Sequence, residues 1–177
     1  MRCVIIMKYP LAYLITFTTY GTWLHGDKRD SVDKEHNQFG EEFIPHNPGL
    51  NTKEQSSLKH PPIKLTAFCR KIVLQAILEV CEFRGWFAHS AHVRSNHVHI
   101  VVSGREKPEK MMRDFKIYAT RAIKKDGKIS VEKYWTRHGS TKYIWTKESL
   151  RSSIEYVKNG QGNIMALGAT EPSACGG

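Results

Sequence analysis

Residues 97–103 (HVHIVVS) hold two histidines, His97 and His99, that alternate with apolar residues. This alternation predicts a β-strand, on which side chains two positions apart share one face and stand about 6.5–7 Å apart. The two imidazoles, the histidine pair, could then bind one divalent cation while Val98, Ile100 and Val102 face a core. The two residues alone equally allow a solvated strand face that binds nothing, because metal sites usually need a third ligand.

A second candidate group is Tyr118, the only strong nucleophile in a helix predicted over residues 108–125. A phenol can act as a nucleophile when its proton is removed or when a metal activates its target. A divalent cation at a phosphate would provide such activation. Tyr118 also shares an apolar stripe with Phe115 and Ala122. On spacing alone, a core tyrosine is therefore the stronger interpretation.

Hydrophobic periodicity indicates which elements must position these groups. The predicted elements are strands over residues 13–20, 86–93 and 97–103, a further strand within residues 134–145, and helices over residues 65–83, 108–125 and 147–158. The order β-α-β-β-α-β, followed by a last helix, predicts an α+β, ferredoxin-like fold with a four-stranded antiparallel sheet. The chain length fits one domain over residues 1–177, with a long loop insertion over 28–64 and a mobile tail over 169–177.

Local signals predict where several elements begin and end. Gly85 fits the residue that follows a helix, Pro108 fits a first helical turn, and Thr146 can cap the last helix. Residues 94–96 are predicted to form a hairpin turn that leads into the histidine strand.

The chain is strongly basic, with a formal net charge of +10. This excess favours a polyanionic partner, above all nucleic acid, although a basic protein without such a partner is the alternative. The basic side chains of the 108–125 helix include Arg113, Lys116 and Arg121, which are predicted to bind the nucleic acid.

The four cysteines are scattered and form no C-x-x-C pair, which argues against a zinc ribbon or a disulfide framework. Reduced thiols in a cytosol fit better. The first residues lack the pattern of a signal peptide, and no apolar run approaches the roughly 20 residues of a membrane span. A cytoplasmic protein without a membrane partner is therefore expected.

Several segments together resemble one family. Residues 96–99 (NHVH) are similar to the histidine-hydrophobe-histidine (HUH) motif of single-tyrosine transposases that act on single-stranded DNA. Residues 115–122 (FKIYATRA) resemble the tyrosine helix of these enzymes. Further similar segments are 14–27, 134–145 and 156–162 (YVKNGQG). The resemblance is strongest to the relatives associated with repeated extragenic palindromes (REP), and it covers most of the chain apart from the long loop and the tail.

The resemblance implies an HUH-type fold and a transposase that binds a DNA hairpin and cleaves the adjacent single strand. Tyr118 would become joined to the 5′ phosphate, and the histidine pair would hold Mg²⁺ or Mn²⁺. The family pattern places a glutamine, a third metal ligand, about one helical turn after the tyrosine, where this chain has Ala122. Asp114, His92, or the DNA together with water are the alternatives for that ligand.

Two other classes of protein compete with this interpretation. A catalytically weakened or domesticated protein on the same fold would bind hairpin or single-stranded DNA without cleaving it. A histidine-triad nucleotide hydrolase would need a third alternating histidine, and Val101 stands at that position. The sequence leaves a monomer and a homodimer equally open, and it leaves open whether the tyrosine acts in its own subunit or in a partner.

Overall fold

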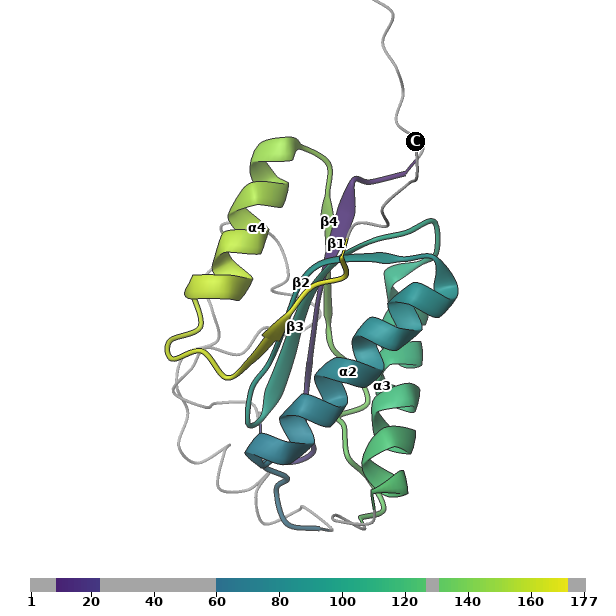
Figure 1. Cartoon of the computed structure of the whole chain (residues 1–177), viewed down its shortest axis with the longest axis vertical. Helices are drawn as coiled ribbons and strands as arrows, with labels where there is room; N and C mark the ends of the chain where they lie inside the picture. Colours follow the sequence, from purple (N-terminus) through teal and green to yellow (C-terminus); the bar gives the residue numbers. More distant parts are fainter. Residues whose placement is uncertain (1–8, 23–59, 127–130, 172–177) are drawn as a thin grey trace, which may run out of the picture.

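The computed structural model of the protein describes residues 9–22, 60–126 and 131–171. Within these ranges it forms one antiparallel sheet of five strands in the order β4-β1-β3-β2-β5 (Figure 1). The strands are β1 (Ala12–Thr18), β2 (Phe87–Val93), β3 (His97–Ser103), β4 (Ser140–Ile144) and β5 (Ala166–Gly168). The first four follow the ferredoxin-like order, which confirms the predicted α+β fold class.

The sheet has five strands where four were predicted. The additional strand, β5, pairs with the free edge of β2, with His92 opposite Leu167. A strand of three residues is too short to show a period-two pattern, so the sequence contains no signal that predicts β5. The strand predicted within residues 134–145 is β4, Ser140–Ile144, and Trp135 of the same range makes an isolated bridge to Thr19.

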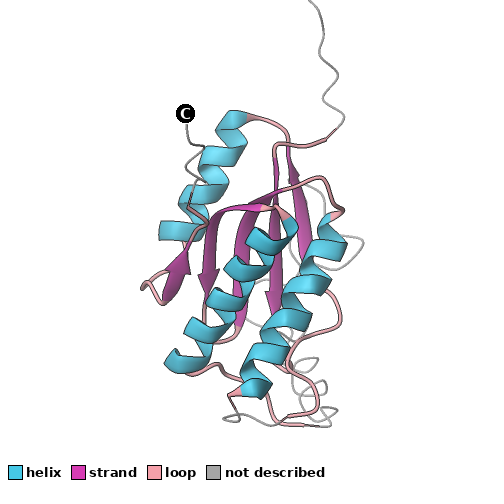
Figure 2. Ribbon diagram, turned by 45° about the vertical axis from the view of Figure 1, so that its right-hand side comes forward, coloured by secondary structure: helices cyan, strands magenta, loops and turns pink. Residues whose placement is uncertain are grey.

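In the part of the chain that the structure describes, three helices cover the two faces of this sheet. Helices α2 (Ala67–Arg84) and α3 (Pro108–Lys125) lie side by side on one face, whereas α4 (Lys147–Asn159) covers the other (Figures 1 and 2). Within the described ranges, no helix is long and apolar enough to cross a bilayer.

The predicted helix ends and the hairpin turn are confirmed. The Thr146 side chain accepts a hydrogen bond from Ser149 N, and Gly85 ends α2 in the left-handed conformation at φ 66°. Pro108 stands in the first turn of α3. The hairpin turn closes through a hydrogen bond of 2.8 Å that Arg94 N donates to the His97 carbonyl.

Alternation along β3 divides its side chains between two cores. Val98, Ile100 and Val102 are fully buried in the larger core, which contains Phe115 of α3. Val101 points to the other face, where it packs with Val157 of α4 in a smaller core. Because side chains two positions apart share a face, His97 and His99 lie on the α4 side of the sheet.

The two predicted irregular segments are described only in part. Residues 28–59 of the loop and 172–177 of the tail lie outside the described residues. At the end of the loop, Ile63 is buried and its N–H donates to the Tyr20 carbonyl at 2.9 Å. At the start of the tail, Thr170 is buried and its N–H donates to the Ala88 carbonyl at 2.9 Å. The mobility of the tail stays a prediction.

Candidate active site

The histidine pair lies on one face of β3, in the middle of the sheet. The two ring centroids are 4.7 Å apart, close enough for both imidazoles to reach one cation. His99 is only 5% exposed, and His97 is partly buried. The strand geometry therefore brings together the two side chains that the sequence assigned to the metal.

Each ring of the pair has a neighbour that orients it. His97 Nδ1 lies 2.8 Å from Asn96 Oδ1, and His99 Nδ1 lies 2.7 Å from Thr16 Oγ1 on the adjacent strand β1. When Nδ1–H donates to such an oxygen, the lone pair is on Nε2, as in most metal-binding histidines. In this tautomer both rings offer Nε2 to a cation.

Burial keeps His99 in the form that binds metals. The pKa of His99 is lowered to about 3, mainly by desolvation and to a smaller extent by the nearby His97, while a hydrogen bond to Gln161 acts in the opposite direction. A divalent cation needs a neutral imidazole. His99 is therefore neutral, and able to act as a ligand, throughout the physiological pH range.

Gln161 supplies an oxygen at the same place. It follows the end of α4, and its Oε1 lies 3.4 Å from His97 Nε2, while its side chain also reaches His99. In the tautomer described above, His97 Nε2 and this oxygen both present lone pairs, which is an arrangement that a cation stabilises. Two imidazole nitrogens and one amide oxygen thus fit a divalent cation.

The tyrosine that lies at this site is Tyr156 of α4. Its ring centroid is 5.6 Å from that of His99, with the ring planes at 74°, and the residue is 46% exposed. Its neighbour Val157 is buried in the smaller core and anchors α4 to the sheet. Tyr156 was not identified as a site residue from the sequence, although the spacing from Tyr156 to Gln161 provides a signal: a tyrosine followed about one turn later by a glutamine.

Tyr118 lies elsewhere. It belongs to α3, on the opposite face of the sheet, where its ring packs against the larger core and the Arg121 guanidinium lies 5.6 Å from the ring centroid. The structure therefore does not bring Tyr118 to the histidine pair. The physical reason is that α3 covers the face that carries Val98, Ile100 and Val102, and the two histidines point away from that face.

The two side chains suggested for the third ligand are engaged in other interactions. His92 Nδ1 lies 3.0 Å from the Val157 carbonyl, and Met165 N donates to its Nε2 at 3.1 Å. Asp114 forms an ion pair with Arg84 at 3.1 Å between α3 and α2. Among the described residues, no group of three His, Cys, Asp or Glu side chains is placed to hold a metal. The amide oxygen of Gln161, by contrast, lies 3.4 Å from His97 Nε2.

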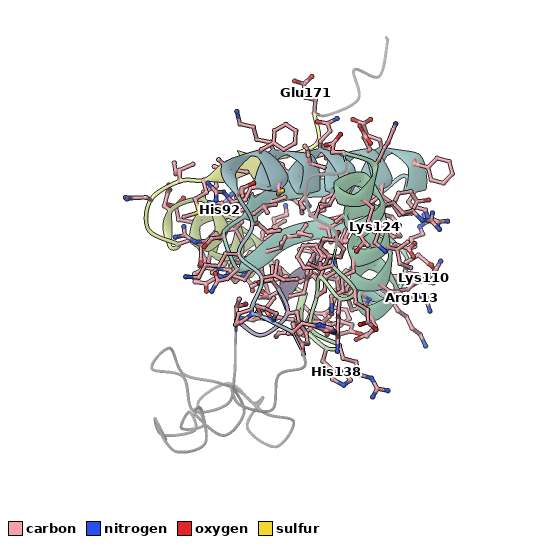
Figure 3. The ribbon with its side chains drawn as sticks, turned by 90° about the horizontal axis from the view of Figure 1, so that it is seen from below. His92, Lys110, Arg113, Lys124, His138 and Glu171 are labelled. Carbon is pink, nitrogen blue, oxygen red and sulfur yellow. The ribbon has the colours of Figure 1, made fainter. Side chains whose placement is uncertain are left out.

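The predicted nucleic-acid-binding residues fall into two kinds. Arg113 and Arg121 are exposed on α3, and Figure 3 shows Arg113 along this helix with Lys110 and Lys124. Lys116 instead donates to the carbonyls of Thr136 at 2.9 Å and His138 at 3.0 Å. Burial lowers the pKa of Lys116 to about 8. Its ammonium group is therefore hydrogen-bonded to the protein backbone in this structure, and its contact with nucleic acid stays a prediction.

A comparison with protein-family models identifies a family. The family model described as "Transposase IS200 like" matches residues 63–159, more than half of the chain. No curated protein sequence matches the chain. One similar solved structure is that of the REP-associated tyrosine transposase bound to a REP hairpin, at 14% sequence identity and a TM-score of 0.48, covering 86% of this chain and 67% of that one. With the histidine pair and Tyr156 inside the matched residues, the chain belongs to the IS200-like transposase family.

Proposed function

We propose that this protein cleaves and rejoins single-stranded DNA next to a hairpin, and that Tyr156 is the nucleophile. The observation that carries this proposal is the contact of the Tyr156 ring with His99, on the face of the sheet where Gln161 meets the histidine pair. The hairpin substrate follows from the resemblance of the motifs, and the net charge of +10 favours a DNA partner.

The chemistry is a transfer of one phosphodiester bond. The Tyr156 oxygen attacks the scissile phosphorus, the bond from phosphorus to the 3′ oxygen breaks, and the phenolic proton is lost while the departing oxygen takes up a proton. The product is a 5′-phosphotyrosine and a free 3′ hydroxyl, and attack by another 3′ hydroxyl reverses the reaction. Mg²⁺ or Mn²⁺ bound by His97, His99 and Gln161 would polarise the phosphate and neutralise its developing charge.

The protein contributes position and protonation state. The Nδ1 partners of the histidine pair, Asn96 and Thr16, hold the rings in place, and burial keeps His99 neutral. The exposed side of Tyr156 lets a DNA strand approach the phenol, while α4 holds its ring against His99. Such prior orientation lowers the entropic part of the barrier.

Two matched tyrosine variants test the proposal. The protein is incubated with labelled hairpin DNA that carries a single-stranded flank, with Mg²⁺ or Mn²⁺, and adducts are counted on a denaturing gel. We expect Tyr156→Phe to abolish the adduct and Tyr118→Phe to retain it, at matched melting temperatures, because only the first removes the attacking oxygen.

The opposite pattern, with an adduct in Tyr156→Phe and none in Tyr118→Phe, would identify Tyr118 of α3 as the nucleophile. A wild-type protein that binds the DNA but forms no adduct with any flank would identify the alternative, a DNA-binding protein on a transposase fold. Identification of the modified peptide by mass spectrometry gives the same answer without mutation.

A further inference from the structure

His92 is a fully buried histidine on β2, directly opposite His99 in the register of the sheet. A buried imidazole is costly unless both of its nitrogens are hydrogen-bonded, and an apolar side chain of similar size would fill the space without that cost. The two hydrogen bonds of His92 therefore account for a histidine at this position.

Those two bonds lead to the two segments that complete the candidate site. In the neutral form, Nδ1–H donates to the Val157 carbonyl at 3.0 Å, and Nε2 accepts from Met165 N at 3.1 Å. Val157 directly follows Tyr156 and lies in the last turn of α4, where carbonyls lack intrahelical partners. Met165 lies four residues after Gln161, immediately before β5.

We propose that His92 is a positioning residue that holds both Tyr156 and Gln161 against the histidine pair. This inference rests on the proposed function. One imidazole, fixed in the central part of the sheet, bonds the end of α4 and the segment that follows it. The β2–β3 hairpin makes a second hydrogen bond to the segment after α4, in which Arg94 Nη1 donates to the Asn163 carbonyl at 2.9 Å. Figure 3 shows His92 beside α4, far from the labelled residues of α3.

Three substitutions of His92 separate its two bonds. His92→Asn places an amide nitrogen near the position of Nδ1 and can keep the bond to Val157. His92→Gln places an amide oxygen near the position of Nε2 and can keep the bond to Met165. His92→Leu removes both. The matched control is His89→Asn, on the same strand, because His89 Nε2 bonds Ser103 Oγ at 2.7 Å and not α4.

The measurements are the single-turnover rate of adduct formation, the Kd for Mn²⁺ alone, and the NMR cross-peak between the Tyr156 and His99 rings. We expect His92→Leu to lose about 10- to 100-fold in rate and to lose the cross-peak, since a displacement of about 1 Å is enough for such a loss. His92→Asn should keep the cross-peak but weaken Mn²⁺ binding, and His92→Gln should show the reverse. His89→Asn should match the wild type.

Wild-type rate, Mn²⁺ affinity and cross-peak in His92→Leu would overturn the inference and leave His92 a packing role. If His92→Leu does not fold, His92→Asn and His92→Gln test the inference instead. Identical cross-peaks and Mn²⁺ affinities in these two variants would contradict the inference. A wild type that forms no adduct defeats the proposed function alone. The NMR cross-peak then tests the role of His92, because it needs neither DNA nor cleavage. Loss of the cross-peak in His92→Leu, or in His92→Gln if His92→Leu does not fold, supports the positioning role. Retention of the cross-peak overturns that role.

Discussion

His89, His92 and His99 lie on the two neighbouring strands β2 and β3, and burial lowers the pKa of each imidazole. Their neighbours give them different roles. His99 faces Tyr156 and Gln161 and suits a cation, whereas His92 bonds the backbone in two directions. The surroundings of a histidine on a strand, and not its spacing alone, thus indicate which role it can have.

These lowered pKa values predict a pH-dependent stability. Unfolding exposes the rings, whose pKa returns to about 6.5, so the unfolded chain binds more protons below that pH. Their contribution is complete above about pH 6.5 and is lost as the pH falls toward the folded value, about 3 for His99. With divalent metals chelated, the melting temperature should fall between about pH 7 and pH 5. In thermal melts over this pH range, the melting temperature of His99→Asn should fall less steeply with decreasing pH than that of the wild type. An equal fall in the two proteins would contradict the contribution of His99.

A second prediction at this scale concerns Lys116. Lys116→Met keeps the aliphatic stem but removes the donors to the carbonyls of Thr136 and His138. We expect a loss of about 1–2 kcal/mol in the free energy of unfolding, with little change in DNA affinity. Arg113→Met is the control and should do the opposite, lowering DNA affinity and reducing the salt slope by about 1. Denaturant unfolding and binding titrations distinguish the two, and weaker DNA binding by Lys116→Met at unchanged stability would refute this role.

At the scale of elements, the end of α4 brings Tyr156 and Gln161 to the histidine pair of β3. The helix begins at the Thr146 cap, packs through Val157, and ends at Gly160, whose N–H donates to the Tyr156 carbonyl at 2.9 Å. A Cβ on Gly160 would lie 2.8 Å from that carbonyl oxygen and 2.9 Å from Tyr156 Cδ2. The absence of a side chain at this position therefore lets the chain turn closely against the tyrosine ring and continue to Gln161.

Gly160→Ala should consequently displace the Tyr156 ring. We expect adduct formation to fall by about tenfold or more, because the backbone and the ring cannot both keep their places. Gly85→Ala is the control: its φ of 66° makes alanine unfavourable, but nothing lies within 4 Å of the added Cβ. That variant should lose about 1 kcal/mol of stability and keep its activity. Equal rates for the two variants, each assayed below its melting temperature, would refute the close-packing argument.

At the scale of the whole molecule, the sheet separates two surfaces. The candidate site lies on the α4 face, whereas the outer side of α3 carries exposed basic side chains, including Arg113, Arg121 and Lys124. With a net charge of +10, the molecule should bind a polyanion largely through phosphate contacts.

DNA binding should therefore weaken steeply with salt, because lysines and arginines release condensed counterions when they bind phosphates. Hairpin DNA with a single-stranded flank should compete better than a flush duplex of the same length, since the proposed reaction at Tyr156 acts on single-stranded DNA. Fluorescence anisotropy over a salt series gives both results. A flat salt response with equal affinity for the two DNAs would indicate a partner other than DNA.

Much of the fold could be predicted because its signals are local. The alternation in β3, the apolar stripes of the helices, and the ends at Gly85 and Thr146 each depend on a few neighbouring residues. The strand β5 could not be predicted, because three residues have no period, and they become a strand only by pairing with β2.

The sequence by itself determined the histidine pair, the order of the elements and the basic character of the chain. Only the tertiary structure decided which tyrosine meets the histidines. A helical pattern tells which face of a helix is buried but not which face of the sheet that helix covers. Tyr118 and Tyr156 both lie on amphipathic helices, and the histidines of β3 point toward α4, so the choice between the tyrosines follows from the layers of the fold.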